Sequence, residues 1–134
     1  MTVTAFDHVN LRTANLDAMG RFYRDILGLV AGERPPFSFG GAWLYCGDQA
    51  VVHLVQVAEP PETREPRLEH FAFRAAGLGD FLALLSGHGV AYETVVVPGM
   101  EIIQVNFHDP DDNHIHVDFQ PHEKAALDVA PGEI

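Results

Sequence analysis

Cysteine and positive charge are scarce in this chain of 134 residues, and each shortage excludes a class of protein. The single cysteine, Cys46, has no partner for a disulfide, so a disulfide framework is excluded and a reducing, cytoplasmic location is expected. Only 8 Lys and Arg residues stand against 19 Asp and Glu residues, which gives a formal net charge of −11. Because such a charge repels phosphate backbones, we expect no binding to nucleic acid.

Long apolar runs are also missing. No segment stays apolar over the roughly 20 residues that a membrane-spanning helix needs. The opening MTVTAFDH has neither the basic start nor the apolar run of a signal peptide. We therefore expect a cytoplasmic protein with no membrane partner. What is present is an apolar content of 47%, enough for a core without disulfides, and eight histidines, which are the compositional oddity.

An internal repeat organises the chain. DHVNLRTANL, residues 7–16, aligns with EHFAFRAAGL, residues 69–78, and places His8 on His70 and Arg12 on Arg74. Each copy opens with period-two alternation, which predicts a half-buried strand, and continues with an apolar stripe of helical spacing. The helix after residue 15 is expected to take Asn15 as its N-cap and Gly28 as its stop, and the second helix is expected to end at Gly87 and Gly89.

The remaining signals complete two βαβββ modules. Further strands are predicted at 42–47, 50–58, 91–97, 102–108 and 114–119, with a short edge strand within 32–41 that Pro35 and Pro36 interrupt. The prediction is an α+β fold with modules at 1–58 and 68–120, a linker at 59–67, one domain over 1–122 and a tail at 123–134, which we expect to be a short helix or a frayed end. Each helix covers one face of its strands. The other faces must curl into a mixed sheet around a central cleft or pair with another subunit.

Histidines recur on the strand faces that point away from the helices. If Val9 and Leu11 pack on the helix, His8, Asn10 and Arg12 face the cleft, and the same reasoning turns His53, His70 and His116 toward it. The repeat shift carries position 53 to 115, next to His116. A single inward histidine is more often a satisfied core residue, but four at equivalent positions favour a divalent transition metal such as Zn, Ni, Fe, Mn or Co.

The chain resembles the vicinal oxygen chelate superfamily, which includes glyoxalase I, fosfomycin and bleomycin resistance proteins, and extradiol dioxygenases. The resemblance covers almost the whole chain and rests on HVNLRTANL, FYRDILGL, LEHFAFRA and DPDDNHIHV. It implies one divalent metal bound between paired modules, with ligands at His8, His53, His70 and His116, and often a homodimer whose sites span two subunits. It also suggests that Arg12 binds a substrate carboxylate, and the alternative for this arginine is a structural salt bridge.

Two positions depart from the family pattern, because His53 and His116 stand where glutamate is usual. In glyoxalase I a metal-bound carboxylate is thought to move the substrate proton, so here a neutral imidazole of His53 or His116 would have to act as the base. The departure also breaks the two-histidine, one-carboxylate set of the dioxygenases, unless Asp118 or Glu101 supplies the carboxylate.

Three functions therefore stay open: a glyoxalase-type lyase or isomerase acting on vicinal oxygens, an Fe(II) ring-cleaving dioxygenase, and a non-catalytic protein that sequesters a small molecule. Trp43 and Tyr45 share one face of a strand and either wall a substrate pocket or belong to the core. Gln104 and Asn106 alternate inward and are candidates for hydrogen bonds to a substrate. His88, His108, His114 and His122 are interpreted as incidental or surface residues.

Overall fold

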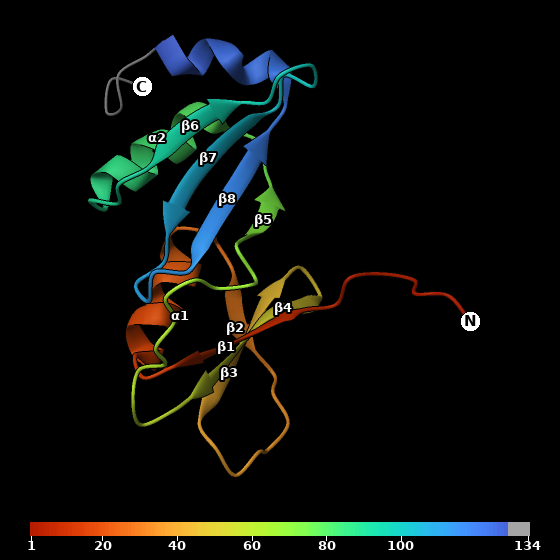
Figure 1. The fold of residues 1–134 in the computed structure, drawn as a ribbon, viewed down its shortest axis with the longest axis vertical. Helices are drawn as coiled ribbons and strands as arrows, with labels where there is room; N and C mark the ends of the chain where they lie inside the picture. The colour runs from red at the N-terminus through yellow and green to blue at the C-terminus, as the bar shows by residue number, and fades with distance from the viewer. Residues whose placement is uncertain (129–134) are drawn as a thin grey trace. The chain divides into compact units, whose positions relative to one another are not determined.

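The computed structural model describes residues 1–128 and divides the chain into two compact units, Met1–Glu65 and Pro66–Ile134. Each unit has the element order βαβββ and one four-stranded mixed sheet with one α-helix (Figure 1). The predicted α+β fold of two βαβββ modules is confirmed. No helix in this described part of the chain is long and apolar enough to cross a membrane.

The first unit builds its sheet in the order β1-β4-β3-β2. β1 runs parallel to β4, and the other neighbours are antiparallel. Met19 and Tyr23 of the helix are fully buried and form the core with apolar residues of the sheet such as Leu44. The elements are β1 (Val9–Thr13), α1 (Leu16–Asp25), β2 (Val30–Gly32), β3 (Gly41–Cys46) and β4 (Gln49–Gln56).

The second unit repeats this plan with the strand order β5-β8-β7-β6. Phe81 of the helix packs against Phe107 and Phe119 of the sheet, with ring centroids 5.8 and 5.6 Å apart. The predicted tail begins inside a 3-10 helix, and residues 129–134 of that prediction lie outside the described residues. The elements are β5 (Phe71–Arg74), α2 (Leu78–Gly87), β6 (Glu93–Val96), β7 (Ile103–His108), β8 (His114–Phe119) and η1 (Pro121–Asp128).

One local prediction was wrong. The edge strand expected within residues 32–41 is β2, which ends at Gly32, because Pro35 and Pro36 have no N–H to extend a ladder and Val30 already pairs with Tyr45. The N-cap prediction is confirmed, because Asn15 occupies the N-cap position of α1, although its side chain makes no capping hydrogen bond. Instead its backbone N–H donates to Thr13 Oγ1 at 2.9 Å, so the side chain of Thr13 fixes the turn into the helix.

The register of each sheet decides which side chains share a face. Opposed residues in a ladder point to the same side. His53 is opposed by Asn10 on one neighbouring strand and by Trp43 on the other. His116 is likewise opposed by Ala72 and Asn106. The predicted histidines therefore lie on sheet faces that alternate with the buried positions Leu11, Val52, Ile115 and Val117, as the period-two pattern predicts.

Candidate metal and substrate site

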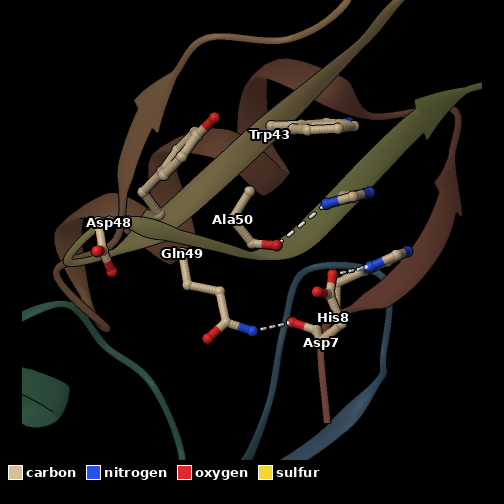
Figure 2. Close-up of a pocket in the computed structure, with 8 residues that line it drawn as sticks. Asp7, His8, Trp43, Asp48, Gln49 and Ala50 are labelled. Atoms are coloured by element: carbon tan, nitrogen blue, oxygen red, sulfur yellow. Dashed lines mark hydrogen bonds and ion pairs between the residues drawn. The ribbon is translucent and has the colours of Figure 1, made fainter. Parts of the chain in front are cut away.

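An open pocket of about 520 Å³ lies on the sheet of the first unit (Figure 2), a volume within the usual range for small-molecule sites. Trp43 and Tyr45, the two predicted wall residues, both line it, together with His8 and His53. The pocket is also lined by Asp7, Asp48, Gln49 and Ala50. The aromatic rings provide apolar area, and the carboxylates and imidazoles provide polar groups.

Three rings in this pocket form one stack. Trp43 lies 4.0 Å from His53, centroid to centroid, and His53 lies 3.8 Å from His8, with interplanar angles of 13° and 9°. An imidazole nitrogen binds a metal through a lone pair that lies in the plane of the ring. An ion about 2.1 Å from one nitrogen of each stacked ring would instead lie between the two ring planes, where neither lone pair points. For His8 and His53 to bind one ion together, one ring must therefore rotate out of the stack. His8 is the freer of the two, because 38% of its side chain is exposed and it belongs to no strand.

Each of these two rings has one nitrogen in a hydrogen bond. His53 Nε2 lies 3.0 Å from the Ala50 carbonyl oxygen, and His8 Nδ1 lies 2.7 Å from Asp7 Oδ1. With both bonds donated by the ring, His53 Nδ1 and His8 Nε2 carry free lone pairs. Gln49 donates to the Asp7 carbonyl oxygen at 2.5 Å, which ties the segment before β1 to β4.

Burial lowers the pKa of His53, and the neighbouring His8 lowers it further, while the Ala50 carbonyl and Asp7 act in the opposite direction. The neutral ring is thus favoured at neutral pH. Neutral imidazole is the form that binds a metal or accepts a proton, so this environment suits either role of His53.

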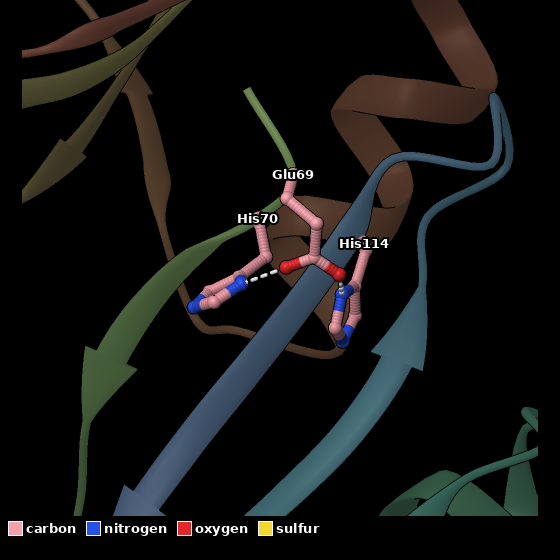
Figure 3. Close-up of side chains that lie close together, drawn as sticks. All are labelled: Glu69, His70 and His114. Atoms are coloured by element: carbon pink, nitrogen blue, oxygen red, sulfur yellow. Dashed lines mark hydrogen bonds and ion pairs between the residues drawn. The ribbon is translucent and has the colours of Figure 1, made fainter. Parts of the chain in front are cut away.

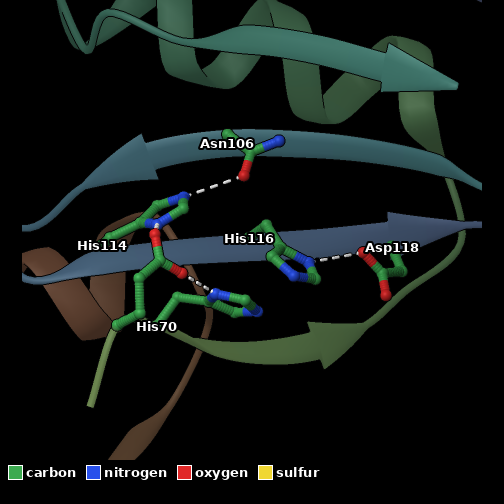
Figure 4. A network of polar contacts seen from close by, with 6 residues as sticks. His70, Asn106, His114, His116 and Asp118 are labelled. Carbon is green, nitrogen blue, oxygen red and sulfur yellow. Dashed lines mark hydrogen bonds and ion pairs between the residues drawn. The ribbon is translucent and has the colours of Figure 1, made fainter. Parts of the chain in front are cut away.

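In the second unit, His70 and His116 lie 4.5 Å apart, centroid to centroid. His116 is 6% exposed, and its Nδ1 donates to Asp118 Oδ1 at 2.6 Å, which leaves Nε2 free (Figure 4). Gln104 is opposed to Asp118 in the ladder and is half-buried on the same face. Of the two carboxylates considered for the site, Asp118 is therefore adjacent to a predicted ligand, whereas Glu101 lies in a turn and pairs with Lys124 at 3.8 Å.

Glu69, His70 and His114 form a cluster at one end of this sheet (Figure 3). One carboxylate oxygen of Glu69 contacts His70 Nδ1, and the other lies 3.0 Å from His114 Nδ1. One ligand atom from each residue lies within 4.8 Å of the other two, so this His/Glu triad could hold a metal ion. Hydrogen bonds from His70 and then His114 lower the pKa of Glu69, which keeps its carboxylate ionised.

Two members of this triad were missed from the sequence. His114 was interpreted as incidental at the exit of a turn, and Glu69 served only as the acidic counterpart of Asp7. The parallel register that opposes Phe71 to Ile115 sets His70 beside His114, with ring centroids 5.2 Å apart. The sequence does not show that His70 and His114 meet, because the two residues are far apart in the chain. Their contact follows from the pairing of β5 with β8.

The other predicted substrate residues are exposed. On β1, Asn10 and Arg12 point to the same face of the sheet as His53 does on β4. Within residues 1–128, Arg12 makes no ion pair. Within these residues Arg12 therefore lacks the structural salt bridge that was the alternative to substrate binding. His88 Nδ1 contacts the Leu84 carbonyl oxygen at 3.0 Å, and His122 is exposed. His108 is exposed but stacks on His114 at 5.3 Å.

The donor chemistry fits a divalent transition metal. Three of the predicted ligands, His8, His70 and His116, keep Nδ1 on a carboxylate and Nε2 free. Ligating histidines commonly hold a carboxylate or carbonyl on the second nitrogen, which fixes the tautomer and raises ligand basicity. The structure pairs His8 with His53 and His70 with His116, each pair within one unit. That all four bind one ion stays a prediction.

Two βαβββ modules, each with one four-stranded mixed sheet, define the fold class of this chain. The chain belongs to the Glyoxalase/Bleomycin resistance protein/Dioxygenase superfamily, whose family model matches residues 5–117. The predicted relationship to this superfamily is confirmed. No curated protein matches the chain.

Solved structures share this fold at low identity. A putative glyoxalase family protein from Bacillus anthracis aligns with a TM-score of 0.74 and 20% identity, covering 90% of this chain and 98% of its own. A glyoxalase/dioxygenase from Nostoc punctiforme aligns with a TM-score of 0.73 and 23% identity, covering 90% and 98%. Lactoylglutathione lyase from Agrobacterium tumefaciens aligns with a TM-score of 0.63 and 19% identity, covering 88% and 95%. At such identities the likeness shows the fold alone.

Proposed function

We propose that this protein is a divalent-metal-dependent enzyme of the glyoxalase type, a lyase or isomerase that acts on a small substrate with vicinal oxygens. The observation that carries the proposal is the hydrogen bonding of the predicted ligands, in which His8, His70 and His116 each keep Nδ1 on a carboxylate and Nε2 free. Membership of the superfamily supports it, and so does the open pocket beside His8 and His53.

The proposed ligands are those of the repeat: His8 and His53 from the first unit and His70 and His116 from the second, in one chain or contributed by two subunits. The ion is one of Zn, Ni, Fe, Mn or Co. When bound, it would polarise the vicinal oxygens and stabilise the negative charge that develops on them.

Side chains of the protein would supply the base and the contacts to the substrate. His53 and His116 are the proposed bases, His53 because its pKa is lowered and His116 because Asp118 orients its ring. Trp43 and Tyr45 would bind the apolar part of the substrate, and Asn10, Arg12 and Gln104 its polar groups. Arg12 suits a carboxylate, since its guanidinium is exposed and unpaired within the described residues.

The test is elemental analysis of protein purified without a metal-affinity tag, followed by turnover assays with the identified metal on a panel of small α-oxo aldehydes, α-hydroxy carbonyls and catechols. We expect about one divalent ion per site and isomerisation or lyase activity on a carbonyl substrate. Metal-free protein that also stays inactive after metal is added would overturn the proposal and favour the non-catalytic, small-molecule-sequestering function.

One observation favours a second candidate, the Fe(II) ring-cleaving dioxygenase. Glu69, His70 and His114 are two histidines and one carboxylate, the donor set of non-haem Fe(II) oxygenases. Oxygen consumption in the presence of Fe(II) and a catechol would support this candidate over the isomerase. Activity that is retained without oxygen and with Zn or Ni would exclude it.

We also propose a homodimer in a reducing compartment. Edge strands offer unpaired backbone groups to another copy, and the edge strands β2 and β6 expose Val30 and Val95. The free thiol of Cys46 is exposed, which suits the cytoplasm. Sedimentation equilibrium would give twice the chain mass if the dimer forms, and the chain mass if it does not.

A further inference from the structure

The polar face of the second sheet carries more histidine than the repeat requires. His108 and His114 join His70 and His116 there, and the Glu69 carboxylate lies between the rings of His70 and His114 (Figure 3). The repeat needs only His70 and His116. We propose that Glu69, His70 and His114 form a divalent-metal site that lies wholly within the second unit and does not need His8 or His53.

The first support is the pair of contacts at His114. Its Nε2 lies 2.8 Å from the carbonyl oxygen of the Asn106 side chain, and its Nδ1 faces Glu69 Oε1 at 3.0 Å. Asn106 therefore fixes the ring with Nδ1 turned toward the carboxylate, so that an imidazole nitrogen and a carboxylate oxygen converge as two ligands of one ion would.

The second support is the spacing. Two ligand atoms that are each about 2.1 Å from one ion, at an angle of 90–110°, are about 3.0–3.4 Å apart. The separation of Glu69 Oε1 and His114 Nδ1 is 3.0 Å, and one ligand atom from each of the three residues lies within 4.8 Å of the others. The side chains of Glu69 and His70 are exposed, so they have room to adjust toward a shared ion.

The third support is that the backbone holds His114 in place. The turn before β8 is built on Asp109, whose Oδ1 accepts hydrogen bonds from the Asp111 and Asn113 N–H groups at 2.9 Å each. Its Oδ2 accepts a third from the Asn113 side chain at 2.8 Å. His114 follows this turn as the first residue of β8, with Asn106 fixing the far side of its ring. A ligand oriented in advance in this way loses little entropy when an ion binds.

The charge of the set also favours a cation. An all-histidine shell leaves the double charge of an ion unneutralised, whereas this set contributes one carboxylate. Glu69, which lies two residues before β5 begins, supplies the carboxylate. The inference goes beyond the glyoxalase-type proposal, which places the ion on four histidines, and it rests on the same triad as the dioxygenase candidate. Because His70 belongs to both sets, we expect one ion at a time.

The test is a Co²⁺ titration of the full chain, followed by calorimetry and by the visible absorption of the bound ion. The background is the double variant His8→Ala, His53→Ala, which removes the first-unit ligands and leaves the second unit intact. We expect this variant to bind one Co²⁺ per chain. Adding Glu69→Gln or His114→Ala should raise its Kd at least 10-fold and change the Co²⁺ absorption, since one ligand is lost. Adding His122→Ala, an exposed histidine of the same unit, is the matched control and should change neither.

Several results would overturn the inference. One is a double variant that is folded by circular dichroism and binds no Co²⁺, as would occur if a proton rather than a metal holds Glu69 and His114 together. Another is an unchanged Kd after Glu69→Gln and His114→Ala. If the double variant instead binds Co²⁺ as tightly as the natural chain, the inference stands and the four-histidine centre fails. If only His116→Ala and the double variant lose the ion, the inference fails and the four-histidine centre stands. A natural chain that binds no Co²⁺ overturns both.

Discussion

One neighbour, Asp118, determines which ring nitrogen of His116 is free. The ring is buried, and Asp118 holds its Nδ1 at 2.6 Å, so the free nitrogen is Nε2 and the tautomer is defined. Both residues lie in the same strand two positions apart, which puts them on one face of the sheet. The same logic applies to Asp7 beside His8, where the pair is adjacent in the chain and more exposed.

We predict that His116→Ala lowers metal occupancy at least 10-fold, because the variant removes a buried ligand and leaves Asp118 without its donor. Inductively coupled plasma mass spectrometry of purified protein measures the occupancy. His88→Ala removes an exposed histidine whose Nδ1 contacts the Leu84 carbonyl oxygen of its own helix, and it should leave occupancy unchanged. Equal occupancy in the two variants would remove His116 from the ligand set.

We predict that Asp118→Asn weakens metal binding about 10-fold without unfolding the protein, because an amide still accepts the Nδ1 hydrogen bond but no longer raises the basicity of the ring. Competition with a chromogenic chelator measures the affinity. Asp111→Asn makes the same charge change at an exposed position and serves as the control. If the two variants bind metal equally well, Asp118 does not tune His116.

At the scale of elements, the turn between β7 and β8 is held by one buried carboxylate. Asp109 is 4% exposed and accepts three hydrogen bonds from the turn. A long-range contact closes the start of α2, where Gly77 and Leu78 donate to the Glu123 carboxylate at 3.0 and 2.8 Å. Both contacts satisfy backbone donors that would otherwise lack partners.

We predict that Asp109→Ala lowers the free energy of unfolding by about 2–3 kcal/mol, since buried donors lose a charged acceptor. Urea denaturation followed by circular dichroism measures the change. Asp111→Ala, at an exposed neighbouring position, should change it by less than about 0.5 kcal/mol. A loss of the same size in both variants would show that the buried carboxylate does not hold the turn.

At the scale of the whole molecule, an ion that binds only the folded chain stabilises it by mass action. The formal net charge of −11 adds to this effect, because a divalent cation reduces self-repulsion among the acidic residues. Free metal at 100 times its Kd contributes about 2.7 kcal/mol.

We therefore predict that removing the metal with a chelator lowers the Tm by on the order of 10 °C, and that adding the ion back restores it. Differential scanning calorimetry of the natural chain measures both steps. The triple variant His70→Ala, His114→Ala, His116→Ala is the matched control and should show no response to metal. A natural chain whose Tm ignores both chelator and metal would contradict a metal bound to the folded state.

The sequence by itself determined the elements and their faces. Apolar residues at period two and at helical spacing predicted both βαβββ modules, and β8 was predicted with its observed ends, because side-chain direction in a strand depends only on position. The same alternation placed His53 and His116 opposite the packed positions, although both are themselves buried. The edge strand was misplaced because local signals do not show which backbone groups already have partners.

Only the tertiary structure decided which polar groups meet. Three contacts join residues that are distant in the chain. They are the stack of His8 with Trp43 and His53, the Glu69 carboxylate that contacts both His70 and His114, and the hydrogen bonds from the start of α2 to Glu123. Such meetings depend on strand order and register, and a shift of one residue would turn each side chain to the other face. The histidines could therefore be counted and assigned to faces from the sequence, whereas their hydrogen-bond partners, and with them the nitrogen that each presents to a metal, follow from the fold.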